Sequence, residues 1–314
     1  MTAIRTHELT KDYLVGFWRP RPYRALDRLS IEVGAGEVFG FLGPNGAGKT
    51  TTLKLLMQLV FPTSGEAEIL GRPVGDIAVR RRIGYLPENP YFYDHLTADE
   101  LLDYYGRLFG MPAAERRARI SRTLDRLGIG AERRLQLRKF SKGMLQRVGL
   151  AQALLNEPDV IFLDEPMSGL DPLGRRDVRE LMLELRDAGR TIFFSSHILS
   201  DAEALCSQVA IVAKGRLAAA GRLADMRAFE VQGWELVMAN VPEPALERVR
   251  ARARKVVGVA GGRYVIDLAP DGRPDEMLRD LVAAGCTLVS LNPVRETLED
   301  VFVRRVAEVG EGAR

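Results

Sequence analysis

The sequence predicts an α/β domain with a helical insert, followed by a small α+β domain, and three observations support this prediction. A glycine-rich loop, Gly43 to Thr51, stands between a strand-like apolar run and a helical run. Two later apolar runs, 160–164 and 191–196, end in polar side chains, as buried strands of a parallel sheet do. After about Asp225 short strands and helices alternate. We therefore expect a first domain over residues 1–225, with the helical insert at about residues 90–150, and a second over 226–314.

The composition is that of an ordinary globular chain of 314 residues, long enough for about two domains. Its net charge of +3 is small against 45 basic and 42 acidic side chains, so we expect no nucleic-acid partner. Cys206 and Cys286 lack metal-ligand spacing, which favours buried thiols in a reducing compartment. No apolar run approaches the roughly 20 residues of a membrane helix, and Met1 to Leu9 lacks the apolar core of a signal peptide. We expect a cytoplasmic protein that reaches a membrane only through a partner.

The loop from Gly43 to Thr51 consists of a glycine, four free positions and then Gly-Lys-Thr. Its glycines let backbone N–H groups turn toward a phosphate, and the following helix adds its positive end. Lys49 is expected to reach the β- and γ-phosphates, and Thr50 to give its hydroxyl to Mg²⁺. A glycine-rich turn could match by chance, but the flanking strand and helix favour a nucleotide-binding loop. The remaining predicted phosphate contacts are Asn45, Gly46, Gly48 and Thr51.

The segments 2–9 and 29–33 are expected to form strands, with an aromatic and basic loop between them. An aromatic ring shortly before a phosphate-binding loop can stack on a nucleotide base. We choose Tyr13 for this role. Phe17, Trp18 and Tyr23 lie in the same loop and remain alternatives, and each of the four rings could instead belong to the core or the surface.

Helical patterns dominate the segment that follows the loop. A helix is expected from about Thr52 to Leu59, and residues 65–71 are typical of a short strand and turn. The three arginines at 80–82 favour a solvated helix end over a phosphate-binding patch, and a further strand follows them. From Thr97 to Leu127 apolar residues recur at helical spacing, and Thr97 with Glu100 forms a capping box. These helices make up the predicted insert.

A second cluster of polar residues follows the insert. The segment 140–147 opens a helix that is expected to run to about Leu155, and the strand 160–164 closes on Asp164 and Glu165. Asp164 is placed to hold Mg²⁺ through water, and Glu165 to orient or deprotonate an attacking water. A solvated strand end is the alternative, but two acids that close an apolar run favour a buried site. After a helix from about 173 to 188, the strand at 191–196 delivers His197.

With these residues in view, the chain resembles the nucleotide-binding subunit of ATP-binding cassette (ABC) transporters, a branch of the P-loop NTPases, over about residues 3–225. The loop 43–51 resembles the Walker A motif of that family, 160–165 its Walker B motif and 168–171 its D-loop, while His197 resembles its switch histidine. The segment 141–147 is similar to the family signature. Lys142 and Met144 depart from the usual Ser-Gly-Gly-Gln spelling, but Ser141 and Gly143 remain.

The resemblance implies ATP as the nucleotide and Mg²⁺ as the ion, with Glu165, His197 and Lys49 as the catalytic residues. Ser141, Gly143 and Asp171 would contact nucleotide, the signature residues by gripping the γ-phosphate bound by a second copy. Glu88 stands where the family generally has a glutamine. A carboxylate can lie near Mg²⁺ but donates no hydrogen bond as an amide does, so Glu88 is carried over as a metal-site residue.

The implied mechanism is ATP-driven dimerisation with a second copy or a homologous subunit. Opening and closing would be transmitted through residues 85–94 and the insert to membrane-spanning subunits, which would hold the chain at the inner face of the cell membrane. The alternative is a soluble ABC-type ATPase switch that acts on the ribosome or on DNA. One cassette, no heptad run and no strong basic excess favour transport. A nucleotide sensor with little turnover is disfavoured by Glu165 and His197 together.

The elements after Asp225 are expected in the order β-α-β-β-α-β, which is that of a ferredoxin-like sandwich. Strands are predicted at 234–241, 255–259, 263–268 and 286–291, and helices at 244–253 and 274–284. The segment carries no catalytic constellation. A dimerisation or regulatory module and passive stabilisation of the first domain are both open. The ending 297–302 resembles the carboxyl-terminal extensions of exporter ATPases, which favours export, while the substrate is not encoded in this chain.

Overall fold

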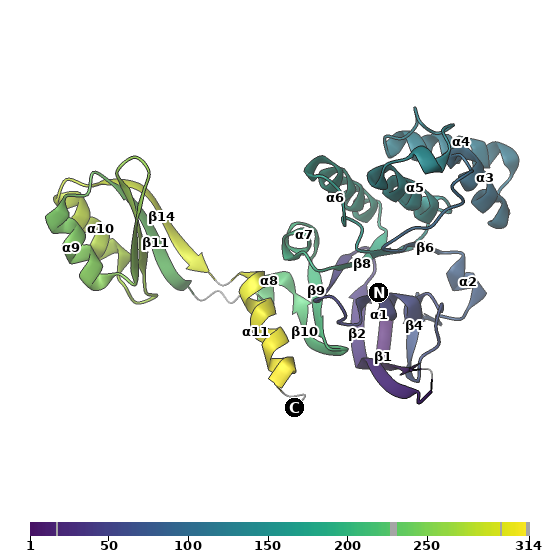
Figure 1. Cartoon of the computed structure of the whole chain (residues 1–314), viewed down its shortest axis with the longest axis horizontal. Coiled ribbons are helices and arrows are strands. Elements are labelled where there is room, and N and C mark those ends of the chain that lie inside the picture. The colour runs from purple at the N-terminus through teal and green to yellow at the C-terminus, as the bar shows by residue number, and fades with distance from the viewer. Residues whose placement is uncertain (17, 227–230, 296, 312–314) are drawn as a thin grey trace. The chain divides into compact units, whose positions relative to one another are not determined.

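The computed structural model describes residues 1–16, 18–226, 231–295 and 297–311 and divides into two compact units (Figure 1). The first unit contains Met1–Ala224 and the part of the last helix that begins at Phe302. The second unit is Asp225–Val301. The division near residue 225 follows the change of pattern in the sequence, whereas the grouping of the last helix with the first unit was not expected.

The first unit is built on a six-stranded sheet with the order β10-β9-β3-β8-β7-β6. All neighbouring strands are parallel except β10, which runs antiparallel to β9. The three central strands are buried at every residue, which confirms the expectation for the apolar runs 160–164 and 191–196. The strand bounds are β3 Val38–Leu42, β6 Ile83–Leu86, β7 Val160–Asp164, β8 Thr191–Ser196, β9 Gln208–Ala213 and β10 Arg216–Arg222.

The order of these strands brings four chain segments to one edge of the sheet. The strands β3, β8, β7 and β6 are consecutive neighbours and run in the same direction. Their carboxyl ends therefore share one edge, which is where ligands bind in open α/β sheets. Four parts of the chain follow these ends: the loop after Leu42, the acids at 164–165, His197 and the segment after Leu86.

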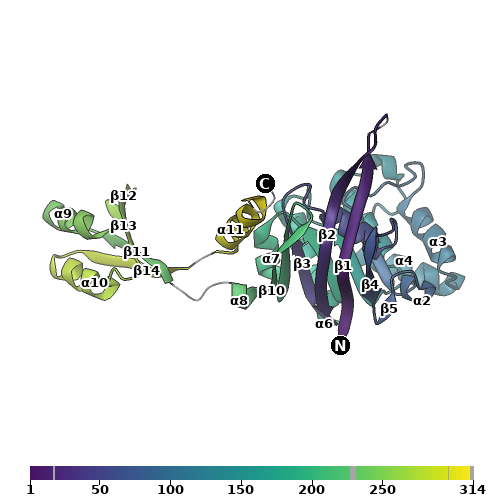
Figure 2. The same ribbon diagram turned by 90° about the horizontal axis from the view of Figure 1, so that it is seen from below.

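A second sheet of the first unit has the order β2-β1-β4-β5 and is antiparallel. Its two long strands, β1 (Thr2–Val15) and β2 (Arg21–Gly34), lie side by side as one hairpin (Figure 2). The prediction of an aromatic loop between the two strands is therefore wrong for the residues that pair in this hairpin. Tyr13 is the register partner of Tyr23, and Arg24 Nε donates a 2.8 Å hydrogen bond to Asp12 Oδ1, so cross-strand pairs extend the hairpin. Phe17 lies outside the described residues. The remaining strands are β4 (Ser64–Ile69) and β5 (Arg72–Pro73).

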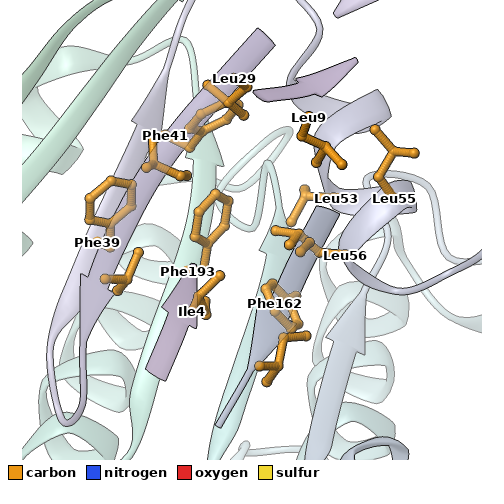
Figure 3. Close-up of a cluster of buried hydrophobic side chains, with 14 of the residues drawn as sticks. Ile4, Leu9, Leu29, Phe39, Phe41, Leu53, Leu55, Leu56, Phe162 and Phe193 are labelled. Atoms are coloured by element: carbon orange, nitrogen blue, oxygen red, sulfur yellow. The ribbon is translucent and has the colours of Figure 1, made fainter. Parts of the chain in front are cut away.

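The core of the first unit lies between the two sheets and helix α1 (Lys49–Leu56) (Figure 3). Phe39 and Phe193 stack with ring centroids 5.4 Å apart, and Phe162 packs on Phe193 at 5.8 Å. Leu53 and Leu56 of α1 are fully buried in the same cluster. Because α1 begins at the end of the glycine-rich loop, this packing holds the loop against the sheet edge.

The helical insert contains α3 (Ala98–Leu108), α4 (Ala113–Arg126), a short 3₁₀ turn (Leu137–Lys139) and α5 (Lys142–Leu154). The predicted capping box is confirmed, because Thr97 and Glu100 exchange side-chain and backbone hydrogen bonds. The helical pattern from 97 to 127 is divided at Gly110, which has a φ of +73°, and at Pro112, the N-cap of α4. The other helices are α2 (Ile77–Arg80), α6 (Pro172–Asp187), α7 (Leu199–Leu205) and α8 (Leu223–Met226).

The second unit contains one antiparallel sheet with the order β12-β13-β11-β14 and two helices. Its elements follow the predicted sequence of types: β11 (Val231–Ala239), α9 (Glu243–Arg252), β12 (Lys255–Val259), β13 (Arg263–Leu268), α10 (Pro274–Ala283) and β14 (Thr287–Arg295). Both helices lie on one face of the sheet (Figure 1), where Leu236 and Ile266 are fully buried against Val249 and Leu281.

The last helix, α11 (Leu298–Glu311), starts at a reciprocal cap. Asp300 N donates a 3.2 Å hydrogen bond to Thr297 Oγ1, and Thr297 N donates a 2.9 Å hydrogen bond to Asp300 Oδ2. None of the helices in the described ranges is both long and apolar enough to cross a membrane.

Candidate nucleotide site

A cleft of about 480 Å³ contains the glycine-rich loop and the ends of the neighbouring strands. Most of its lining consists of residues predicted from the sequence: Tyr13, Asn45, Gly46, Gly48, Lys49, Thr50, Thr51, Glu88, Glu165 and His197. The structure therefore brings together side chains that are up to 184 positions apart, from Tyr13 to His197. Four additional residues complete the lining: Tyr23, Ala25, Ala47 and Ser168.

Two glycines give the loop its shape. Gly46 has a φ of +77° and Gly48 a φ of +104°, both in the left-handed region that other residues rarely adopt. A Cβ added at Gly48 would lie 2.6 Å from the carbonyl oxygen of Ala25, so a side chain there would also collide with β2. Gly48 is the N-cap of α1, so the loop ends where the free N–H groups of the helix begin. An anion in the cleft would meet those donors.

Lys49 is held inside the site rather than extended into solvent. Its Nζ donates hydrogen bonds to the carbonyl oxygens of Gly43 at 2.7 Å and Pro44 at 3.3 Å, and it lies 3.2 Å from Glu165 Oε1. Lys49 and Glu165 are each 7% exposed. A buried charge of either sign costs free energy unless it is paired, so each of the two side chains compensates the burial of the other.

Asp164 and Glu165 are joined through Ser195 of the neighbouring strand. Ser195 Oγ donates a 2.6 Å hydrogen bond to Asp164 Oδ1 and accepts a 2.9 Å hydrogen bond from Glu165 N. Glu165 adopts a φ of +50°, a left-handed conformation that is unfavourable for a residue with a side chain. Such strain is retained where surrounding contacts over-determine it, often in active sites. Here it turns the second acid away from the strand and toward the cleft.

Asp164 is the most deeply buried acid of the site, with 1% exposure. Burial raises its pKa above the ordinary carboxyl value, while the hydrogen bond from Ser195, the nearby Thr50 hydroxyl and the charge of Lys49 act in the opposite direction. Its Oδ2 has no hydrogen-bond partner among the described residues. A buried oxygen without a partner costs free energy, and a cation bound there would satisfy it. Asp164 therefore fits a metal ligand.

A divalent cation would need oxygens from outside the protein at this position. The described residues contain no group of three or more His, Cys, Asp or Glu side chains that could hold a metal by themselves. Mg²⁺ normally keeps several waters and binds through one or two carboxylates together with substrate phosphates. Thr50 and Glu88 line the cleft, and with Asp164 they supply the kind of oxygen donors that Mg²⁺ prefers.

His197 lies beside the second acid. Its Nδ1 is 2.9 Å from Glu165 Oε2, and the ring is half exposed to the cleft. Glu165 is therefore bracketed by Lys49 on one carboxylate oxygen and His197 on the other. The arrangement holds the carboxylate in one orientation at the edge of the cleft, where it can act on a water molecule.

Tyr13 and Tyr23 form the outer wall of the cleft from the hairpin. They are register partners, so their side chains stand on the same face of the sheet. Lys11 Nζ lies 5.1 Å from the centre of the Tyr13 ring, which is within the range of a cation–π interaction. Both rings provide a flat apolar surface next to the loop. Tyr23 as well as Tyr13 can therefore meet a nucleotide base.

Besides the buried Asp164, three predicted residues do not line the cleft: Ser141, Gly143 and Asp171. Ser141 is the exposed N-cap of α5 and accepts a hydrogen bond from Met144 N at 3.2 Å, while Asp171 is the exposed N-cap of α6 and accepts one from Gly174 N at 2.7 Å. Lys142 lies over Gly169, where an added Cβ would come within 2.7 Å of the lysine Nζ. These residues belong to a separate surface of the same unit.

The residue patterns did not single out Ser195. It lies in the apolar strand 191–196, and its register partner on β7 is Asp164. A polar residue near the end of a buried strand was the available signal, but its partner depends on the strand order. Taken together, a phosphate-sized loop, a buried cation and an oriented carboxylate define a phosphate-loop nucleotide hydrolase.

Comparisons with known proteins identify the family within that class. The family model for ABC transporters matches residues 26–168. An ABC transporter ATP-binding protein of Synechocystis sp. is 46% identical over 310 residues, which covers 98% of this chain and 86% of the relative. The bacitracin transport ATP-binding protein BcrA of Bacillus licheniformis is 42% identical over 219 residues, 69% of this chain and 68% of the relative. The Nod factor export ATP-binding protein I of Paraburkholderia xenovorans is 36% identical over 251 residues, covering 78% and 82%.

A comparison with solved structures finds a relative whose oligomeric and nucleotide states are known. An ATP-binding cassette determined as a dimer after hydrolysis, with ADP and Pi bound, has a TM-score of 0.65 and 26% identity, and the match covers 72% of this chain and all of that one. The chain belongs to the ABC transporter family, as an ATP-binding subunit that hydrolyses ATP.

Proposed function

We propose that this chain drives export through separate membrane-spanning subunits, by binding ATP as a dimer and hydrolysing it. The observation that carries the proposal is the bracketed carboxylate of Glu165, which lies 3.2 Å from Lys49 and 2.9 Å from His197 in the same cleft as the glycine-rich loop. Export is supported by relatives whose names refer to bacitracin transport and to Nod factor export.

In this proposal each side chain of the cleft has one task. The loop N–H groups and Lys49 hold the β- and γ-phosphates, and Lys49 moves from its carbonyl contacts to the phosphate oxygens. Glu165 orients or deprotonates the water that attacks in line with the leaving phosphate. His197 holds Glu165 in position. Charge stabilisation by preorganised donors supplies most of the rate enhancement, because little covalent chemistry is left to the protein.

Thr50, Glu88 and Asp164 would hold Mg²⁺ in the same site. The unpartnered Oδ2 of Asp164 supports this assignment. When bound, Mg²⁺ neutralises charge on the β- and γ-phosphate oxygens. Glu88 adds a negative charge where the resemblance leads one to expect a neutral amide, so it is the donor whose role differs most from the family pattern.

The second copy supplies the residues that the cleft lacks. Ser141, Gly143 and Asp171 are at the N-terminal ends of α5 and α6, away from the cleft of their own chain. In a head-to-tail dimer the signature surface of one copy would close the cleft of the other and contact its γ-phosphate. The dimeric state of the related cassette with ADP and Pi supports such an arrangement.

The membrane partner would dock on the insert. Large apolar side chains are exposed on it and just before it: Tyr91, Tyr93, Tyr104, Leu108 and Phe109, with Tyr91 exposed by 94%. Apolar patches of this kind mark interaction sites on soluble domains. The chain would thus lie at the inner face of the membrane through this contact, since no helix of the described ranges is long and apolar enough to span it.

We also propose that residues 1–225 are the ATPase domain and 226–314 an accessory domain of the ferredoxin-like class. The order of element types and the antiparallel sheet order β12-β13-β11-β14 support the fold assignment.

The test is a Glu165→Gln chain with ATP and Mg²⁺. The amide cannot take up a proton, so we expect slow hydrolysis and a trapped dimer, whereas Glu157→Gln, an exposed glutamate with the same φ of +50°, should behave like the native chain. A monomeric and active Glu165→Gln chain would contradict the dimer mechanism. Pull-down of the trapped form from gently solubilised host membranes should recover a multi-span protein. Recovery of ribosomes or DNA-bound proteins alone would support the switch alternative and overturn transport.

A further inference from the structure

The sheet of the second unit has one covered and one uncovered face. Residues that alternate along the central strand β11 show the difference: Leu236 and Met238 are fully buried under the helices, while Glu235, Val237 and Ala239 are partly exposed. On the edge strand β12, Val257 and Val259 are 40% and 41% exposed. Side chains of neighbouring strands that are register partners stand on the same face, so these residues form one continuous surface.

The register arranges this face in three rows that cross the strands. The middle row is apolar and contains Val257, Val265 and Val237, which are consecutive register partners on β12, β13 and β11. One flanking row consists of Lys255, Asp267 and Glu235, and the opposite row of Val259, Arg263 and Ala239. The face is therefore an apolar band with carboxylates on one side and Arg263 on the other. We call it the valine face.

The charged side chains of the valine face have no ion pair or side-chain hydrogen bond within the described chain. This holds for Glu235, Lys255, Arg263 and Asp267, although Lys255 and Asp267 are register partners. Arginines on the helical side of the same unit are paired, as Arg252 is with Asp280 at 2.8 Å and Arg279 with Asp275 at 3.0 Å. The valine face thus combines an apolar centre with charges that lack partners, in contrast to the other side of the unit.

The charges on the valine face of one copy are complementary to those on the valine face of a second copy. Arg263 and Asp267 lie two residues on either side of Val265 on one strand, which places them about 7 Å from it in opposite directions. A two-fold axis along the valine row would put the row of one copy on the row of the other. The same rotation exchanges the flanking rows, so Arg263 of each copy would face Asp267 of the other.

We propose that the valine face is a self-association surface, on which a second copy of this chain packs sheet against sheet. The contact is isologous, with two Arg263–Asp267 pairs around a shared valine band. Face-to-face sheets pack about 10 Å apart, a distance that arginine and aspartate side chains can bridge at the edge of an apolar centre. The contact requires no nucleotide, so it is independent of the ATP-dependent dimer proposed above.

The size of the face predicts a weak contact. With β14 included, the sheet has four strands about 4.8 Å apart and about six residues long, so its whole open side gives roughly 400 Å² per copy, or about 800 Å² in total. Stable interfaces bury about 1,200–2,000 Å² in total, so this pair alone should dissociate readily. Joined to an ATPase unit that dimerises, the same contact would raise the effective concentration of the second interface. It would keep two chains together between rounds of hydrolysis.

The test is the sedimentation velocity of the full chain without nucleotide, over a wide range of protein concentration. We expect reversible dimerisation that increases with concentration. Arg263→Asp and Asp267→Arg should each weaken it by at least about tenfold, because each creates two like-charge contacts across the two-fold axis. Arg279→Asp, on the helical side, is the matched control and should dimerise as the native chain does. Circular dichroism of each variant checks that it is folded.

A mixture of the two single variants gives the decisive measurement. The R263D chain has a carboxylate at both positions of the pair, while the D267R chain has a guanidinium at both, so a heterodimer of the two regains both ion pairs. We expect association in the mixture that neither variant shows alone, and it should be restored in the R263D/D267R double variant as well. A chain that stays monomeric at every concentration would overturn the proposal, as would single variants that dimerise normally or a mixture that remains monomeric. None of these results depends on ATP hydrolysis.

Discussion

Charged side chains lie in opposite environments in the two units of this chain, buried at the sheet end of the first and exposed on the valine face of the second. In the first unit Lys49, Asp164 and Glu165 are buried at the end of the sheet and are held by ion pairs or hydrogen bonds, and one of them lies on strained backbone. In the second unit the charges of the valine face are partly or fully exposed and have no partners within the described chain. The residues proposed for catalysis lie at strand ends in one unit, whereas the strand ends of the other carry no comparable cluster within the described residues.

This difference predicts different responses to substitution. Removal of one partner from a buried pair leaves an uncompensated charge, which is expensive. An exposed charge on a sheet face is solvated and can be changed with little effect on stability. The first unit should therefore be sensitive at a few positions, and the valine face should tolerate change in the monomer.

The largest effect is expected from Lys49→Ala. The change removes the cation that is proposed to hold the phosphates and leaves Glu165 without the partner 3.2 Å away. We expect ATP hydrolysis to fall at least about a hundredfold, in line with the loss of one electrostatic contact to a transition state. Steady-state ATPase rates and nucleotide binding measure the effect. Lys54→Ala, on the exposed side of the same helix, should retain native rates; equal activity of both variants would refute the role of the loop.

Substitutions at adjacent positions on the two faces of the second unit should change its stability by different amounts. Leu236→Ala removes a fully buried side chain and should lower the free energy of unfolding by about 2–5 kcal/mol. Val237→Thr changes the valine face and should alter it by less than about 1 kcal/mol. Denaturant unfolding, followed by the fluorescence of Trp234 in a Trp18→Phe background, reports on this unit because Trp234 packs on its core. Equal losses from both variants would mean that the valine face is covered within the monomer.

These alternating positions also show what the sequence could predict. The period of apolar residues gave the strands and helices of the second unit to within a few residues, and the motifs gave the acids, the lysine and the histidine of the cleft. Strand order is not a local property, however. The bond between Ser195 and Asp164 depends on β8 lying beside β7, and the strain at Glu165 depends on contacts from both strands.

The hairpin was missed for a related reason. Its charged and aromatic residues lack the simple alternation of a half-buried strand, so a loop was expected between 9 and 29. Pairing across the strands, such as Tyr13 with Tyr23 and Arg24 with Asp12, stabilises the extension instead. The result changes the site, because both tyrosines then face the cleft.

A smaller effect, on thermal stability, is expected from substitution of two acids, one in each unit, whose pKa values are shifted in opposite directions. Burial is the main cause that raises the pKa of Asp201, whose Oδ2 has no hydrogen-bond partner among the described residues; Arg179 and Arg175 act in the opposite direction. The unfolded chain, with a pKa of about 3.9, binds fewer protons than the folded chain as pH rises above that value. Stability is therefore lost as pH rises through the folded pKa. Asp201→Asn should melt higher than the native chain at pH 7, and the difference should vanish below about pH 4.

Asp275 in the second unit provides the contrasting case. The hydrogen bond and charge of Arg279 lower its pKa, so its contribution to stability is present above the unfolded pKa and is lost as pH falls through the folded one. Asp275→Asn should therefore melt slightly lower than the native chain at pH 7, by a small amount because the pair is exposed. Thermal melts of both variants from pH 3 to pH 8 make the comparison. The same sign in both variants at pH 7 would contradict the assignment of burial as the cause at Asp201.

The smallest effect is expected from Glu88→Gln, at the exposed rim of the cleft. The amide has the shape of the carboxylate but no charge, and it can donate a hydrogen bond. Because the main phosphate contacts are proposed to come from Lys49 and the loop, ATP affinity should change by only a few fold. Turnover, or its stimulation by the membrane partner, should change more, since Glu88 lines the cleft and directly precedes the insert in the sequence. Parallel measurement of nucleotide affinity and of the ATPase rate, with and without the partner, separates the two. A rate and an affinity that both stay native would show that Glu88 takes no part in the site, and that the sensitive charges of this unit are limited to those buried at the strand ends.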